Sequence, residues 1–581
     1  MDSKRLIIDF IKENKYKYLL GIIFILIVDT LQMVFPKILG YITDDLQNGS
    51  ITTQMILGYI GLILTVSFGM VVFRFLFRIY IFGTEKKLEY QLRKKLFNHL
   101  LTLSNRFYNT HKTGDMMALA TNDINAVRMA MGMGILLLVD TIFLTIAVLI
   151  VMFKTIDIRL TLLALTPMPI IALFGIWFGK IVHRRFTAVQ EAFSALTDKV
   201  QESLSGIRVV KAFVQEKDEL SQFNEASQIS FEKNMHLARL WGVVFPFTQL
   251  IATLGFVIII GYGGIQVMMG DISMGDFIAF NSYLAMLVWP MMSLGWIINI
   301  VQRGSASLNR INEILIEQPE ITDSEAMDIS SLKGHIRFEK VDFSYEGSQS
   351  PVLEQIDIDL PPGKTLAIIG STGSGKTTLV NLLLRLYDIK GGALTIDGYP
   401  IHKIPLSVLR TDIGYVPQET FLFSTSIKEN IAFGKYKCSD REIEYAAKIA
   451  QIYDNISELP AGFDTIVGER GVTLSGGQKQ RVSIARALIM DPKILILDDS
   501  LSAVDTNTEE EILKGLKTVM TQRTSIIIAH RISSILHADE IILLEDGHII
   551  ERGNHKSLLE QKGHYFSLHQ KQLLEQEIEQ T

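Results

Sequence analysis

The chain has 581 residues, 48% of them hydrophobic, and a formal net charge of −6, and its length alone allows roughly four domains. The charge does not identify a partner, because Lys and Arg are plentiful in both halves, and we expect no nucleic-acid ligand. The single cysteine, Cys438, excludes internal disulfides and argues against a fused cysteine peptidase.

Long apolar stretches dominate the first half of the chain. We place six of them, near residues 17–41, 53–81, 131–153, 159–182, 241–269 and 275–303. Each exceeds the roughly 20 residues that an α-helix needs to span a bilayer. The sequence therefore predicts an all-α polytopic membrane domain of six transmembrane helices over residues 1–320, a linker at 321–334 and a second domain at 335–581.

The loop charges predict the orientation of these spans. Lys4, Arg5, Lys12, Lys15 and Lys17 lie at or before the start of the first span. Residues 44–48, which follow it, contain no Lys or Arg, whereas residues 86–95 contain five. Because positive residues stay in the cytoplasm, we expect a multi-pass plasma-membrane protein whose N-terminus is inside. The first apolar stretch lacks a small-residue cleavage site, so we expect no cleavable signal.

Four charged residues fall within predicted spans: Asp29, Arg74, Arg78 and Asp140. Ionised groups are rare at such positions and are usually paired or functional. An Asp–Arg pair that stabilises the bundle is the favoured interpretation, because an unpaired charge is costly there. Attraction of cationic substrates by one of the acids is the alternative.

A complete phosphate-binding loop lies in the second domain, between an apolar strand at 365–369 and a helix that starts near Thr378. Its residues are Gly370, Ser371, Thr372, Gly373, Ser374, Gly375, Lys376 and Thr377, and Thr378 is a further expected contact. The glycines allow backbone N–H groups to wrap the phosphates at the helix N-terminus. Lys376 is expected to reach the β- and γ-phosphates and Thr377 to ligate Mg²⁺. The motif predicts an α/β P-loop domain that binds ATP and Mg²⁺.

A pair of aspartates follows the apolar run 494–497, which is typical of a buried parallel strand. We expect Asp498 to hold Mg²⁺ through water. Asp499 stands where a hydrolysing ATP cassette has a glutamate that orients the attacking water. An Asp side chain is shorter by about 1.5 Å, and a misplacement of about 1 Å can cost on the order of 10²-fold in rate. We therefore expect this site to bind ATP well and to hydrolyse it poorly.

Residues 474–478 read Leu-Ser-Gly-Gly-Gln and precede a helical run at 479–488. A serine and two glycines at a helix start make an anion-binding nest. Together with the phosphate-binding loop, this pentapeptide resembles the nucleotide-binding domain of ABC transporters, whose signature it is. The resemblance implies that Ser475, Gly476, Gly477 and Gln478 bind the γ-phosphate of ATP held by the opposite subunit.

Three further positions match the same family. The resemblance gives Tyr345 the role of stacking on adenine, which leaves GTP open as an alternative to ATP. It gives Gln418 the role of sensing Mg²⁺ and linking the cassette to the membrane domain. His530, after the apolar strand 525–529, matches the switch histidine that contacts the γ-phosphate. Asp499, His530 and Gln418 are thus the expected catalytic residues.

Four short stretches resemble family elements that carry signals. Residues 468–471 resemble the cross-linking loop of exporters, and residues 502–505 resemble the loop that signals across the cassette dimer. Residues 113–118 and 206–213 resemble the transmission elements of the membrane domain, which lie in a groove of a cassette in that family.

The whole chain is most similar to the BmrC-type subunit of bacterial heterodimeric multidrug exporters, in which one partner carries this Glu-to-Asp replacement. The resemblance implies ATP-driven export of hydrophobic or amphipathic compounds across the lipid bilayer. A second half-transporter would supply the catalytic Glu, and the signature of this chain would complete that site. A homodimeric exporter, a lipid flippase, and a nucleotide-gated sensor or channel are alternatives. The transported substrate and the identity of the partner are not predicted.

Overall fold

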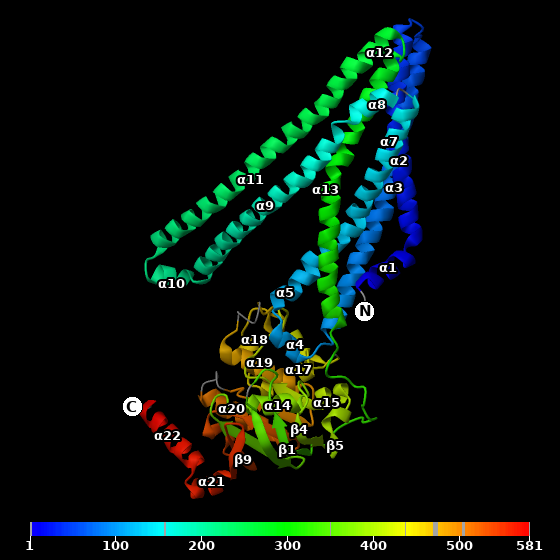
Figure 1. Cartoon of the computed structure of the whole chain (residues 1–581). Helices are drawn as coiled ribbons and strands as arrows, with labels where there is room; N and C mark the ends of the chain where they lie inside the picture. The colour runs from blue at the N-terminus through cyan, green and yellow to red at the C-terminus, as the bar shows by residue number, and fades with distance from the viewer. Residues whose placement is uncertain are drawn as a thin grey trace. The chain divides into compact units, whose positions relative to one another are not determined.

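The structure is a computed structural model that describes residues 3–155, 158–348, 350–435, 437–468, 474–501 and 506–579. It divides the chain into two compact units (Figure 1). The helical unit comprises residues 1–101 and 112–317. The α/β unit comprises residues 318–581 together with the short segment 102–111.

The helical unit consists of long helices joined by short turns. Its helices are α1 (Ser3–Glu13), α2 (Lys15–Gln47), α3 (Thr53–Leu100), α5 (Thr113–Ala118), α6 (Ile124–Met129), α7 (Ile135–Thr155), α8 (Ile158–Leu165), α9 (Met168–Ser205), α10 (Ile207–Ala212), α11 (Glu216–Ile258), α12 (Gly264–Met269) and α13 (Met274–Ile316). Short π-helical segments at Leu119–Asp123, Ala130–Gly134 and Ile259–Gly263 join α5 through α7, and α11 to α12, into continuous helices.

Five helices in the described part of the chain are long and apolar enough to cross a membrane: Lys15–Gln47, Thr53–Leu100, Thr113–Lys154, Glu216–Met269 and Met274–Ile316. The remaining expected span, 159–182, is divided between α8 and the start of α9. The division falls at Thr166 and Pro167, with Pro169 in the first turn of α9. Proline is tolerated at the start of a helix but interrupts its interior, which explains why one apolar stretch forms two helices.

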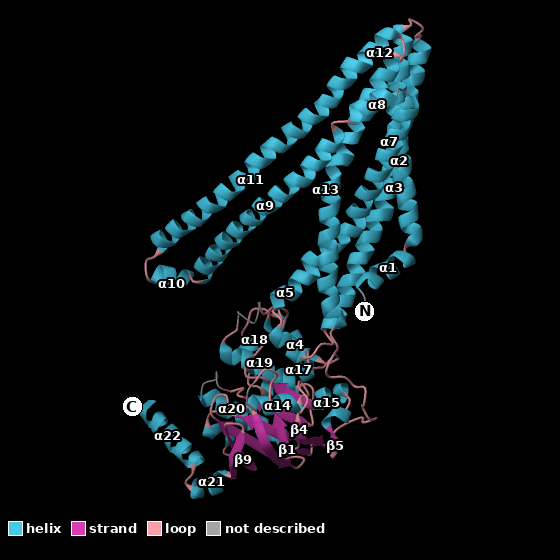
Figure 2. Cartoon of the chain, in the orientation of Figure 1, coloured by secondary structure: helices cyan, strands magenta, loops and turns pink. Residues whose placement is uncertain are grey.

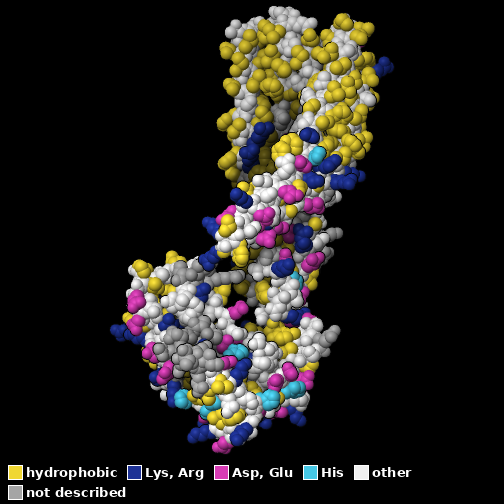
Figure 3. Space-filling model, turned by 90° about the vertical axis from the view of Figure 1, so that its left-hand side faces the viewer, with side chains coloured by type: hydrophobic (Ala, Val, Ile, Leu, Met, Phe, Trp, Pro, Cys, Tyr) yellow, Lys and Arg dark blue, Asp and Glu magenta, His cyan; other side chains and the backbone are white. Residues whose placement is uncertain are grey.

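Packing in the helical unit is centred on α13, which contacts α2, α6 and α7, while α9 packs along α11. Buried polar contacts join these helices. The hydroxyls of Thr141 and Ser293 lie 2.6 Å apart, and the Tyr283 hydroxyl donates to the Met33 carbonyl at 2.9 Å. Hydrophobic side chains cover much of the visible surface of this unit (Figure 3), as expected of helices that face lipid.

The intramembrane charges form one group. Asp29 of α2 is buried, and Asp140 of α7 and Arg74 of α3 are close enough to interact with it electrostatically. Arg74 is close enough to attract both acids. Among the described residues, Asp29 Oδ2 is buried without a hydrogen-bond partner.

The α/β unit contains two sheets (Figure 2). The antiparallel sheet has the order β2–β1–β4–β5, with β1 at Ile336–Phe343, β2 at Leu353–Leu360, β4 at Gly391–Ile396 and β5 at Tyr399–Pro400. The larger sheet has the order β10–β9–β3–β8–β7–β6, with β3 at Thr365–Gly370, β6 at Ile413–Val416, β7 at Ile494–Asp498, β8 at Thr524–Ile528, β9 at Glu540–Glu545 and β10 at His548–Gly553. Strands β9, β3, β8, β7 and β6 are parallel.

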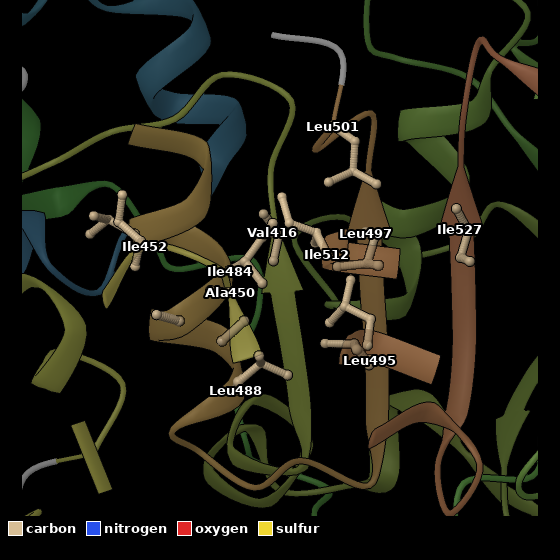
Figure 4. Packing of buried hydrophobic residues seen from close by; sticks show 14 of the residues in the cluster. Val416, Ala450, Ile452, Ile484, Leu488, Leu495, Leu497, Leu501, Ile512 and Ile527 are labelled. Atoms are coloured by element: carbon tan, nitrogen blue, oxygen red, sulfur yellow. The ribbon is translucent and has the colours of Figure 1, made fainter. Parts of the chain in front are cut away.

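Helices cover the larger sheet. They are α14 (Lys376–Leu383), α15 (Leu406–Asp412), α16 (Ile427–Ala432), α17 (Asp440–Ile449), α18 (Tyr453–Ser457), α19 (Gly476–Leu488), α20 (Thr506–Met520), α21 (His555–Gln561) and α22 (His564–Glu579). Every residue of β7 and β8 is buried, which explains their unbroken apolar runs. In Figure 4, Leu495 and Leu497 of β7 lie in a core shared with Ile484 of α19 and Ile512 of α20.

Candidate nucleotide site

The predicted site residues lie at one edge of the larger sheet. The phosphate-binding loop follows β3, Asp498 ends β7, His530 follows β8, and Gln418 follows β6. These four strands are adjacent and parallel, so their carboxyl ends meet at the same edge. Ligands of α/β proteins bind at this edge.

The phosphate-binding loop has the conformation that a phosphate cradle needs. Gly373 and Gly375 have φ angles of +87° and +101°, a left-handed region that favours glycine. Helix α14 begins at Lys376, so its free N–H groups point into the loop. The ammonium of Lys376 donates to the carbonyls of Gly370 and Ser371 at 2.9 and 2.7 Å. The hydroxyl of Ser374 is buried and has no partner among the described residues, as suits a group reserved for a ligand.

Two buried charges face each other beneath this loop. Burial lowers the pKa of Lys376, and the nearby carboxylates of Asp498 and Asp499 act in the opposite direction. Burial also raises the pKa of Asp498, although hydrogen bonds from Thr377 and Tyr415 favour its charged form. A polyphosphate with a divalent cation would compensate both groups, because it brings negative charge to the lysine and positive charge to the aspartate.

The oxygen atoms around Asp498 fit a magnesium ion. The Thr377 hydroxyl lies 3.4 Å from Asp498 Oδ1, and the Tyr415 hydroxyl lies 3.4 Å from Oδ2. Gln418 Nε2 lies 3.3 Å from Asp499 Oδ2. Mg²⁺ prefers oxygen ligands and binds through one or two carboxylates plus phosphate oxygens, which matches this donor set.

Asp499 is held in an unusual backbone conformation. Its φ is +46°, and its N–H donates to the Ile528 carbonyl of the adjacent strand at 2.9 Å. Asp tolerates the left-handed region better than most residues. The strand therefore fixes where the side chain starts, and the side chain is one methylene shorter than Glu would be.

Tyr345 joins the phosphate-binding loop through its hydroxyl. That hydroxyl lies 3.1 Å from Thr378 Oγ1 at the start of α14. The ring meets Phe343 and Tyr387 edge to face, with centroids 5.0 and 5.2 Å away. Tyr345 is thus placed beside the loop, where stacking on a base has been predicted.

The signature residues form the start of α19. The Ser475 hydroxyl accepts from the Gln478 N–H at 3.3 Å, and Gln478 Oε1 accepts from the Ser475 N–H at 3.0 Å, a capping box. Ser475 and Gly476 are exposed. Within the described residues, no hydrogen bond joins Ser475–Gln478 to the phosphate-binding loop.

Two predicted loops cannot be placed. Residues 469–473 and 502–505 lie outside the described residues, so the structure gives no account of the stretches 468–471 and 502–505 as elements. The transmission stretch 206–213 contains helix α10, in the helical unit.

Residues 102–111 belong to the α/β unit, although they lie in the first half of the chain. They contain α4 (Asn105–Thr110). Asn105 and Asn109 donate to the Tyr387 hydroxyl at 3.2 and 2.7 Å. Arg106 pairs with Glu320 and Glu346 at 2.6 and 2.7 Å. The stretch predicted as a transmission element at 113–118 forms α5 of the helical unit, and its role stays a prediction. The polar side chains that bind the α/β unit precede it.

Comparison with known proteins agrees with this architecture. The family described as ABC transporter transmembrane region matches residues 18–291, and the family described as ABC transporter matches residues 353–502. The first match covers most of the helical unit together with the segment 102–111, and the second lies within the α/β unit.

Full-length relatives match almost the whole chain. The probable multidrug resistance ABC transporter ATP-binding/permease protein YheI of Bacillus subtilis is 41% identical over 97% of both chains. The multidrug resistance-like ATP-binding protein MdlA of Escherichia coli is 40% identical over 96% of this chain and 95% of its own. An ATP-dependent lipid A-core flippase of Syntrophus aciditrophicus is 37% identical over 84% of this chain and 81% of its own.

A solved structure of a bacterial Atm1-family ABC exporter with ATP bound has the same fold. It superposes with a TM-score of 0.79 and 27% identity, and the match covers 96% of this chain and 98% of that one. The chain therefore belongs to the ABC transporter family, as a multi-pass membrane exporter whose helical membrane domain is followed by an ATP-binding domain that couples ATP hydrolysis to transport.

Proposed function

We propose that the chain is one half of a heterodimeric multidrug exporter and that its own nucleotide site is impaired in hydrolysis. The observation that carries the proposal is Asp499, a short carboxylate on a fixed backbone at the end of β7. General-base catalysis requires the carboxylate within hydrogen-bonding reach of the water. An Asp at this position falls short by about one carbon–carbon bond, roughly 1.5 Å.

The remaining residues of the site take distinct roles in this proposal. Lys376 and the backbone of residues 370–375 bind the phosphates, and Tyr345 stacks on the base. Thr377, Asp498 and Gln418 hold Mg²⁺, which when bound neutralises charge on the β- and γ-phosphates. His530 contacts the γ-phosphate. Ser475, Gly476, Gly477 and Gln478 bind the nucleotide held by the partner, which supplies the catalytic Glu.

The membrane topology is part of the same proposal. Six spans, with the helix pair α8–α9 counted as one, return the chain to the side of its N-terminus. The basic residues before the first span and at 86–95 support a cytoplasmic N-terminus and α/β unit. We place the domain boundaries at 1–320 and 335–581. The transported compounds are hydrophobic or amphipathic, as the names of the multidrug-type relatives suggest.

Measuring the ATPase activity of the purified full chain, alone and then with candidate partner half-transporters, tests this function. We expect little activity alone and a large increase with the correct partner. Asp499→Glu restores the missing reach and should raise the activity of the chain alone. If the unmodified chain alone turns over as fast as its Asp499→Glu variant, the site is competent and the homodimeric alternative replaces the heterodimer.

A lipid flippase is the second candidate, because relatives at 37% and 38% identity are lipid A-core flippases. The two candidates differ in the compound that stimulates ATP hydrolysis. Stimulation by phosphorylated glycolipid, with none by cationic drugs, would favour the flippase over the multidrug exporter.

A further inference from the structure

The C-terminal helix α22 is anchored firmly at its start, at the red end of the chain in Figure 1. The carboxylate of Glu551 accepts from the N–H groups of His564 and Tyr565, which caps the helix. Tyr565 is fully buried in the core of the α/β unit, and its hydroxyl lies 2.8 Å from His555 Nδ1. The position of the next turns of α22 is therefore set by the core.

One face of α22 continues from this anchor toward the site. Tyr565, Leu568 and Gln572 follow one another at i, i+3 and i+7, so they lie on the same side of the helix. Leu568 packs against the same core as Tyr565. Gln572 is a half-buried polar residue on this face, two turns beyond Tyr565.

Both ends of the Gln572 amide form hydrogen bonds with the segment that carries His530. Nε2 donates to the His530 carbonyl at 2.7 Å, and Oε1 accepts from the Ile532 N–H at 2.9 Å. The amide therefore pairs with the backbone on both sides of Arg531, as a neighbouring strand would. These bonds restrain the backbone torsions of residues 530–532, from which the exposed His530 imidazole projects.

A second helix holds the same segment from another direction. Glu509 of α20 is buried and pairs with Arg531 at 2.8 Å. Its other oxygen accepts from the Ser534 hydroxyl. This loop is held at two backbone positions and two side-chain positions, so its geometry is preorganised. Preorganised geometry is what a phosphate-contacting group requires.

We propose that Gln572 is a positioning residue for His530: it fixes the backbone of residues 530–532 so that the imidazole meets the γ-phosphate of ATP. This inference rests on the role proposed for His530. ATP carries the γ-phosphate and ADP does not. Loss of the positioning therefore weakens ATP binding while ADP binding is retained.

The test uses an azido-ATP probe on the assembled full-length transporter and reads the label on this chain alone, so that the partner's site does not contribute. Competition by ATP and by ADP gives the affinity for each. For Gln572→Ala we expect ATP affinity to fall about 10-fold, the order of magnitude for the loss of one hydrogen bond to a charged group, with ADP affinity unchanged. Gln570→Ala, an exposed glutamine on the same helix, is the matched control and should change neither.

Two further variants separate positioning from folding. Gln572→Glu keeps the side-chain length and the acceptor for Ile532 but has no donor for the His530 carbonyl, so it should show the same selective loss to a smaller degree. The double variant His530→Ala with Gln572→Ala should bind ATP no worse than His530→Ala alone, because the two act on one contact.

Equal loss of ATP and ADP affinity in Gln572→Ala, or no loss of either, would overturn the positioning role. If His530→Ala weakens ATP binding and Gln572→Ala does not, only the inference about Gln572 fails. If His530→Ala itself leaves ATP and ADP binding unchanged, the role proposed for His530 fails, and the positioning role fails with it.

Discussion

At the scale of single residues, the impaired hydrolysis that we propose for this chain rests on Asp499. Its carboxylate still meets the Gln418 amide, at 3.3 Å, and its backbone is still bonded to β8. The buried lysine and aspartate next to it keep the opposed charges that a magnesium–nucleotide complex requires. In our proposal, binding and hydrolysis depend on different atoms of the same strand end, and the Asp at position 499 impairs only hydrolysis.

Single substitutions of the intramembrane acids Asp29 and Asp140 test whether these residues stabilise the bundle or attract cationic substrates. If the pair with Arg74 stabilises the bundle, Asp29→Asn should lower expression and thermal stability and reduce transport of all compounds alike. If an acid attracts cationic substrates, transport of cations should fall while neutral compounds are spared. Transport assays with matched cationic and neutral compounds, with protein yield measured in parallel, decide between the two, and Asp44→Asn at the end of α2 serves as a control outside the pair.

Local motifs were predictable because their chemistry is contiguous. Eight consecutive residues define the phosphate-binding loop, and the strand and helix around it have clear apolar patterns. The contacts of Gln572 with His530 and of Asn105 with Tyr387 join residues 42 and 282 positions apart. Ordinary polar residues on helix faces make these contacts, and no sequence period marks them. The apolar stretch 159–182 was long enough for one helix, but Pro167 starts a new one within it.

At the scale of elements, α4 connects residues of the first half to the base side of the nucleotide site. Its two asparagines donate to the Tyr387 hydroxyl, and the Tyr387 ring meets that of Tyr345. If the base stacks on Tyr345 as we propose, a change in the position of Tyr345 has a short route to α4, through one ring and two hydrogen bonds.

Tyr387→Phe tests this route, because it keeps the ring and removes the shared acceptor. The variant loses two hydrogen bonds, each worth roughly 1 kcal/mol, but neither of them contacts the nucleotide. We therefore expect the basal affinity for ATP to stay within about 2-fold of the unmodified protein. Stimulation of ATPase by transported compounds should fall several-fold. Tyr399→Phe, at an exposed tyrosine of β5, is the control. Normal stimulation in Tyr387→Phe would exclude this hydroxyl from coupling.

The orientation of the whole molecule in the membrane follows from the loop charges and can be tested by labelling. A tag at residues 47–50 should react with an impermeant reagent on intact cells. Tags at residue 112 or 215 should react only after permeabilisation, because our proposal places those segments in the cytoplasm on the basis of the loop charges. Reaction at residue 215 on intact cells would contradict the six-span topology.

The heterodimer proposal requires the two nucleotide sites of the assembled transporter to differ in their rates of ATP hydrolysis. Asp499→Asn should change steady-state ATPase of the complex by less than about 2-fold, because the short carboxylate contributes little to hydrolysis. Ser475→Ala should reduce the steady-state ATPase activity by on the order of 10²-fold, the usual cost of losing a preorganised hydrogen-bond donor to an anion. Lys376→Ala should reduce the ATPase activity only in part, because Lys376 belongs to the slow site in this proposal.

Ser439→Ala is the matched control for the signature variant. Ser439 caps α17 in a capping box of the same kind as that of Ser475, with Glu442 in the place of Gln478. Both variants remove one helix cap, which costs about 1 kcal/mol, so a stability effect would be shared by the two. Only the signature serine faces the partner's γ-phosphate in the proposed assembly, and only its loss should stop turnover. If Asp499→Asn silences the complex as completely as Ser475→Ala does, this chain carries a working site and the heterodimer interpretation is wrong.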